Sequence, residues 1–159
     1  MTHPFEQLYM PQELACEFLA VFSRFEYALK STAYALGGAN HVTPDWDLFG
    51  RHIDERFRAS SNEKIADAID FLLKHSPRKQ VLVDGRIRLR DCPPDRNLPQ
   101  AVQVLLMVRR VRNNLFHGGK YLPDGETEAG RNECLVSCSM QVLKYCLDMV
   151  PEVRVSYEH

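Results

Sequence analysis

A long, strongly apolar helix ends in the segment Val111-Arg112-Asn113-Asn114-Leu115-Phe116-His117-Gly118-Gly119-Lys120, which is the most informative part of the sequence. Apolar side chains recur at helical spacing upstream of it, which predicts a buried helix from residue 98 to about residue 116. Glycine readily adopts the left-handed backbone conformation that ends helices, so Gly118-Gly119 predict its end. An arginine, an asparagine and a histidine therefore gather at one helix terminus.

Polar side chains interrupt the apolar face of this helix. The predicted face comprises Leu98, Val102, Leu105, Val108, Leu115 and Phe116. Arg112 falls near the middle of that face, while Asn113 and His117 are neighbours at its margin. Burying an unpaired arginine is costly, so Arg112 either pairs with an acidic residue, Glu26 being the candidate, or opens onto a functional cleft. His117 fits a helix C-cap as well as a functional residue.

The rest of the chain predicts further helices around this one. Apolar periodicity indicates helices over about 11–36, over 45–57, from 61 onward and over about 128–149. Alternating apolar residues on both sides of Asp84-Gly85 predict a small β-hairpin over about 80–90. The expected fold is all-α, a bundle of four or five helices in a single domain spanning 1–159, with that hairpin inserted.

Composition narrows the class of protein. The 159 residues carry a formal net charge of −1 and are 45% hydrophobic, which argues against a broad basic surface. Two local basic clusters remain, Arg109, Arg110 and Arg112 in one and Arg78, Lys79, Arg86, Arg88 and Arg90 in the other. The sequence shows neither an apolar run of about 18 residues nor a secretory signal, so we expect a cytoplasmic protein without a membrane partner.

The cysteines and histidines do not have the spacing of metal ligands. Cys134, Cys138 and Cys146 recur at helical spacing and are expected to be small buried residues with reduced thiols. A zinc site would need a second set of ligands at matching distance, which the sequence lacks. We therefore expect neither a metal nor another cofactor.

The helix terminus carries the chemistry that RNA cleavage without a metal needs. Arginine provides a permanent forked charge for a phosphate, and histidine moves a proton near neutral pH. Arg112 and His117 lie about 140° apart around one helix, so a single chain is poorly arranged to aim both at one phosphate. Two chains related by a two-fold axis would remove this difficulty.

Arg112-Asn113-x-x-x-His117 resembles the R-polar-x-x-x-H motif of the HEPN superfamily, the higher eukaryote and prokaryote nucleotide-binding domains. The whole segment 112–120, and Phe22-Ser23-Arg24-Phe25-Glu26-Tyr27-Ala28-Leu29-Lys30 in the first helix, are similar to prokaryotic members of its ApeA-like branch. The resemblance implies a helical bundle that forms a homodimer with the motif helices near the two-fold axis. It also implies a metal-independent endoribonuclease with a toxin or antiviral defence role.

By this resemblance His117 would take the proton from a ribose 2′-hydroxyl, and Arg112 would neutralise the scissile phosphate. Asn113 would orient His117 or bind phosphate or sugar, and the product would carry a 2′,3′-cyclic phosphate. Glu26 would hold Arg112 in place, and Gly118 would leave open backbone beside His117. The candidate RNA contacts are Arg109, Arg110, Lys120 and Tyr121.

A second interpretation remains open. The chain is then a catalytically silent dimeric HEPN module that binds a nucleotide or a protein partner, with Arg112 in a structural role. Under the first interpretation the expected partners are an RNA substrate, a second copy of the chain, and an antitoxin or regulatory protein.

Overall fold

Helices dominate the part of the chain that the computed structural model describes, which is residue 5 and residues 8–119 and 129–159. The helices are α1 (Gln12–Lys30), α2 (Trp46–Arg58), α3 (Glu63–Lys74), α4 (Gln100–Phe116), α5 (Arg131–Leu147) and α6 (Pro151–Glu158). Strands β1 (Ala35–Gly38) and β2 (His41–Pro44) form one antiparallel hairpin, and β3 (Lys79–Val83) and β4 (Arg86–Arg90) form another. The prediction of a mainly helical bundle is confirmed, with one more helix and one more hairpin than expected.

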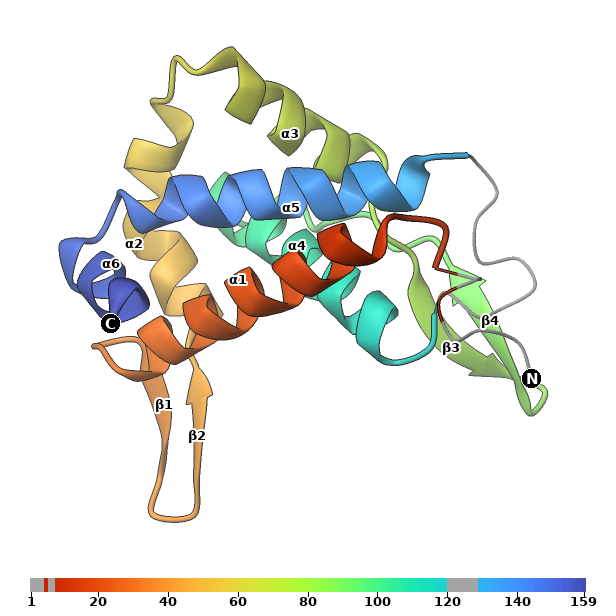
Figure 1. The fold of residues 1–159 in the computed structure, drawn as a ribbon, viewed down its shortest axis with the longest axis horizontal. Helices are drawn as coiled ribbons and strands as arrows, with labels where there is room; N and C mark the ends of the chain where they lie inside the picture. Colours follow the sequence, from red (N-terminus) through yellow and green to blue (C-terminus); the bar gives the residue numbers. More distant parts are fainter. Residues whose placement is uncertain (1–4, 6–7, 120–128) are drawn as a thin grey trace.

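The helices pack around α4 and α5. Helix α5 lies against α1, α3 and α4, and α2 packs on the other side of α4 (Figure 1). An aromatic cluster joins α1 to α2, where the rings of Phe25 and Trp46 stack with centroids 5.5 Å apart. The rings of Phe25 and Phe49 meet in a T-shaped arrangement, with their centroids 5.6 Å apart. This cluster fixes α1 beside α2 through large, buried side chains.

Helix α4 is buried on more than one face because three other helices surround it. Its buried apolar residues are Ala101, Val102, Val104, Leu105, Met107, Val108 and Val111. The predicted apolar face is confirmed at Val102, Leu105 and Val108, but it is wrong at Phe116, which is 44% exposed. Leu98 precedes the helix and is only half-buried.

The first helix ends earlier than its apolar pattern predicts. Helix α1 stops at Lys30, and the residues up to Leu36 enter a turn and then β1. Two hydroxyls compete with the helical hydrogen bonds there: Ser31 Oγ donates to the Tyr27 carbonyl (2.9 Å) and Thr32 Oγ1 to the Ala28 carbonyl (3.1 Å). The predicted extension of this helix to 36 is therefore wrong.

The C-terminal part also differs from its prediction. Helix α5 begins at Arg131 and ends at Leu147, whereas we expected about 128–149, and position 128 lies outside the described residues. A separate short helix, α6, follows, with Pro151 in its first turn. Proline suits that position because its missing N–H would have no helical acceptor there.

The predicted hairpin over 80–90 is confirmed, with β3 and β4 joined by Asp84 and Gly85. Both turn residues have positive φ, 48° and 70°, as a tight two-residue hairpin turn requires. The two hairpins lie at opposite ends of the bundle (Figure 1). Within the described ranges, no helix combines the length and the apolar character that crossing a bilayer requires.

Candidate functional site

The end of α4 is shaped by its C-cap. The backbone N–H of His117 donates to the Asn113 carbonyl at 2.8 Å, so His117 occupies the cap position itself. Gly118 follows with φ of 78°, the left-handed conformation that the glycine pair predicts. The His117 side chain is exposed, so it is available to a ligand while its backbone ends the helix.

The β3–β4 hairpin is fastened to this helix end by two side-chain amides. Asn114 is buried, and its Nδ2 donates to the Arg78 carbonyl at 2.7 Å, immediately before β3. Gln80 Nε2 donates to the His117 carbonyl at 3.4 Å. Of the two adjacent asparagines, Asn114 therefore holds the fold together, whereas Asn113 is exposed.

A hollow of about 290 Å³ opens where β3 meets the last turns of α4. It is lined by Lys79, Gln80, Leu106, Arg109, Arg110, Asn113, Asn114 and His117. The hollow gathers four of the residues singled out from the sequence, namely His117, Asn113, Arg109 and Arg110. Sequence reasoning missed Lys79 and Gln80 as part of this site. Lys79 belongs to the second basic cluster, but nothing in the sequence indicates that this cluster lies beside His117.

The cations of the hollow differ in how freely they can bind a ligand. The Arg110 guanidinium is engaged by carbonyls, with Nη1 donating to Cys92 at 2.5 Å and to Pro77 at 3.2 Å. Arg109 has its Cζ 5.9 Å from the Trp46 ring centroid. Burial lowers the pKa of Arg109, and the negative charge of Glu26 opposes this shift. Arg109 is thus the candidate phosphate contact of the pair, whereas Arg110 mainly holds backbone.

Arg112 lies beside the hollow rather than in it. Its Cζ is 5.4 Å from the Phe22 ring centroid and 5.3 Å from that of Phe116, and its Nη1 donates to Asn113 Oδ1 at 3.1 Å. No ion pair joins Arg112 to Glu26 in the described part of the chain, so the predicted pairing is not formed. Two aromatic rings hold the guanidinium instead, and Asn113 connects it to the hollow.

The remaining predicted contacts differ in status. Lys120 and Tyr121 lie outside the described residues. Gly118 follows His117 directly, and a Cβ at this glycine would meet nothing within 4 Å, so the space beside the Gly118 backbone is open.

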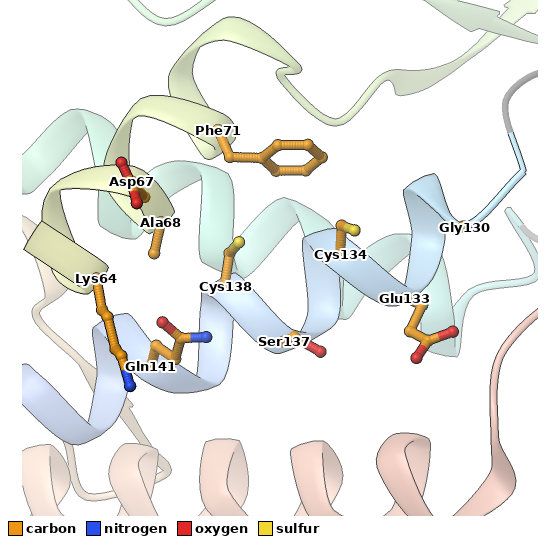
Figure 2. Close-up of a pocket in the computed structure, with 10 residues that line it drawn as sticks. All are labelled: Lys64, Asp67, Ala68, Phe71, Gly130, Glu133, Cys134, Ser137, Cys138 and Gln141. Carbon is orange, nitrogen blue, oxygen red and sulfur yellow. The ribbon is translucent and has the colours of Figure 1, made fainter.

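A larger hollow, of about 670 Å³, lies between α3 and α5 and contains two thiols. Cys134 and Cys138 present their sulfurs on the side of α5 that faces Phe71 (Figure 2). Burial, and then the neighbouring Cys134, raise the pKa of Cys138, which keeps it a thiol and a weak nucleophile. The predicted burial is confirmed for Cys146 but is wrong for Cys134, which is exposed.

Metal ligands do not converge in either hollow. Across the described ranges, no group of three or more histidine, cysteine, aspartate or glutamate side chains could hold a metal ion. The hollow at His117 instead offers an imidazole, three side-chain amides and three cations. These groups can bind an anion and transfer a proton.

Comparison with known proteins returned nothing: neither a family model, nor a curated protein, nor a solved structure matches this chain.

Proposed function

We propose that this protein is a metal-independent endoribonuclease of the HEPN type. One observation carries the proposal: the exposed His117 and Asn113 share a hollow with the cations Arg109 and Lys79, and Arg112 is hydrogen-bonded to Asn113. A general base beside groups that neutralise a phosphate is what transesterification of RNA requires.

In the proposed reaction, His117 takes the proton of a ribose 2′-hydroxyl. The 2′-oxygen then forms a bond to the adjacent phosphorus while the bond from phosphorus to the 5′-oxygen breaks. Arg112 and Arg109 neutralise the charge that develops on the phosphate. A protonated imidazole, supplied by His117 of a second copy, returns a proton to the leaving 5′-oxygen, and a 2′,3′-cyclic phosphate remains.

Two copies suit this reaction better than one. Within one chain the Arg112 guanidinium is held between Phe22 and Phe116, outside the hollow that contains His117. In a homodimer with the ends of both α4 helices at the two-fold axis, Arg112 of one copy would face the hollow of the other. A toxin or antiviral defence role, and an antitoxin or regulatory partner, belong to the same proposal.

The test is cleavage of single-stranded RNA in the presence of EDTA, with the 3′ ends of the products analysed for cyclic phosphate. His117→Ala should abolish cleavage, whereas His75→Ala is the matched control, since His75 is also an exposed histidine at the C-cap of a helix. RNA in which the 2′-hydroxyl is replaced by hydrogen should resist cleavage. Cleavage that survives His117→Ala, or products without cyclic ends, would refute the mechanism.

A mixing experiment tests the composite site. His117→Ala and Arg112→Ala proteins, each inactive alone, should recover part of the activity when subunits exchange, because one site of the heterodimer then keeps the general base His117 and the Arg112 of the other copy, and lacks only the second imidazole that protonates the leaving 5′-oxygen. If active wild-type dimers form but mixing restores nothing, each chain holds its own complete site.

A second candidate function is favoured by the position of Arg112. Its guanidinium packs between two rings, as a purely structural arginine would. The protein would then be a silent dimeric module that binds a nucleotide or a protein partner through the hollow. Nucleotide binding that needs Arg109 and Lys79, without any cleavage of RNA, would identify this function.

A further inference from the structure

The β3–β4 hairpin has one strongly basic face. Its register pairs Lys79 with Arg90, Val81 with Arg88 and Val83 with Arg86, and side chains of paired residues lie on the same side of a hairpin. The basic face therefore comprises Lys79, Arg86, Arg88 and Arg90, with Val81 and Val83 between them. The opposite face comprises Gln80, Leu82, Ile87 and Leu89.

The four cations of the basic face are available to a ligand. All four are exposed, and none of them forms an ion pair with another described residue. The nearby carboxylate of Asp91 lies 3.3 Å from Arg78, which is not part of this face. A protein with a net charge of −1 thus concentrates on one small hairpin four cations that no carboxylate of the described residues neutralises.

The basic face continues into the hollow at His117. Lys79 is the first residue of the face and also lines the hollow, and Gln80 ties the same strand to the His117 carbonyl. Along β4 the arginines recur at every second residue, or about 7 Å apart. This interval is comparable with that between successive phosphates of an extended single strand.

We propose that the basic face of the β3–β4 hairpin binds the backbone phosphates of single-stranded RNA and leads the strand into the hollow at His117. The choice of RNA as the polyanion rests on the function proposed above, whereas the binding of phosphates rests on the hairpin alone. An anionic membrane fits the hairpin less well. A bilayer would take the face with the exposed Leu82 and Ile87 and leave the four cations directed toward water.

The test measures binding of a short, fluorescent 2′-O-methyl RNA by anisotropy in EDTA over a range of salt concentrations. This probe has no free 2′-hydroxyl, so the protein cannot cleave it and wild-type protein can be used. The variant R86Q/R88Q/R90Q removes three charges from the basic face. The matched control R51Q/K74Q/R154Q removes three exposed charges from α2, α3 and α6.

The expected result is selective. The hairpin variant should bind at least about tenfold more weakly at low salt. Its slope of log affinity against log salt should be shallower by about 2, since each lost phosphate contact on a single strand accounts for about 0.7. The control should keep the wild-type slope. R86K/R88K/R90K retains the charges and should also keep the slope, which separates loss of charge from a misfolded hairpin.

Three results would overturn the proposal. The hairpin variant and the control could weaken binding equally, or neither could weaken it. Alternatively, the hairpin variant could lose binding to vesicles of phosphatidylcholine and phosphatidylserine while RNA binding stays unchanged, which would assign the face to a membrane. The cleavage assay is independent of these results. If the hairpin variant selectively loses RNA binding but the wild-type protein does not cleave RNA, the role of the basic face is supported and the ribonuclease function is refuted. If the protein cleaves RNA but both variants bind it equally well, the ribonuclease function is supported and the role of the basic face is refuted.

Discussion

Asp54 caps the helix that carries the candidate site, although it belongs to another helix. Helix α4 follows Pro99 and has no side-chain cap of its own. Oδ1 of Asp54, in α2, accepts a hydrogen bond from the backbone N–H of Ala101 at 2.9 Å, and Oδ2 lies 2.9 Å from Arg58 Nε. The Asp54 side chain is only 15% exposed. We predict that Asp54→Ala destabilises the protein far more than its surface ion pair alone would suggest.

The expected size of the effect follows from these contacts. Loss of a helix N-cap costs about 1 kcal/mol. Loss of a partly buried carboxylate at a helix N-terminus adds roughly 0.5–1 kcal/mol, and the Arg58 pair contributes about 0.3–0.5 kcal/mol. Asp54→Ala should therefore lower the free energy of unfolding by about 2 kcal/mol. Asp54→Asn keeps an acceptor oxygen but loses the charge, so it should cost about 1 kcal/mol.

Urea unfolding followed by circular dichroism measures this difference. With a slope of about 2 kcal/mol per molar urea, the Asp54→Ala midpoint should fall by about 1 M. The control is Asp70→Ala, because Asp70 forms a comparable pair with Lys74 (2.8 Å) on α3 but is 58% exposed. That variant should change stability by less than about 0.5 kcal/mol. Equal losses for Asp54→Ala and Asp70→Ala would refute the cap between helices.

Three further predictions concern the site and the thiols. Arg112→Lys should lower the rate of RNA cleavage at least roughly tenfold, because an ammonium cannot keep both the ring contacts and the hydrogen bond to Asn113. It should change the free energy of unfolding by less than about 1 kcal/mol. Unchanged single-turnover rates of cleavage would contradict this prediction. Asn114→Ala should cost about 1–3 kcal/mol in thermal unfolding, against less than about 0.5 kcal/mol for Asn113→Ala, since only Asn114 is buried and donates a hydrogen bond to the partly buried Arg78 carbonyl before β3. Equal shifts would be evidence against this anchor. Burial raises the pKa of Cys146, so at mildly alkaline pH mass spectrometry should find this thiol unalkylated while the exposed Cys16 reacts. Equal labelling of both thiols in the folded protein would show that the burial is wrong.

Much of the fold could be predicted from the sequence because its signals are local. The apolar spacing in 45–57 and after Ser61 predicts two amphipathic helices, and Asp84-Gly85 predicts the hairpin turn. The β1–β2 hairpin escaped prediction because its strands have only four residues each and are largely exposed, so they show no apolar alternation. Pro151 was an overlooked signal for α6, since proline in a first helical turn is typical.

Only part of the candidate site could be predicted from the sequence. Asn113 and His117 lie one helical turn apart in one segment, so their convergence follows from helix geometry. The contribution of Lys79 depends on how the hairpin docks, which Asn114 and Gln80 determine through bonds to distant backbone. Arg112 could not be placed by this reasoning. The sequence analysis expected a buried arginine either to pair with a carboxylate or to open onto a cleft, whereas Arg112 packs against the apolar rings of Phe22 and Phe116.

The two hydrogen bonds that the Asn114 and Gln80 side chains form between the hairpin and α4 also predict which parts of the molecule unfold together. The backbone amides of an exposed two-stranded hairpin normally exchange their hydrogens with solvent far faster than those of a central helix. Here Asn114 and Gln80 couple the first strand to the last turn of α4, so the amides of β3 and of that turn should exchange with solvent as one cooperative unit. The hydrogen-exchange protection of the His117 amide would then report whether the hairpin is occupied, without any label at the site itself.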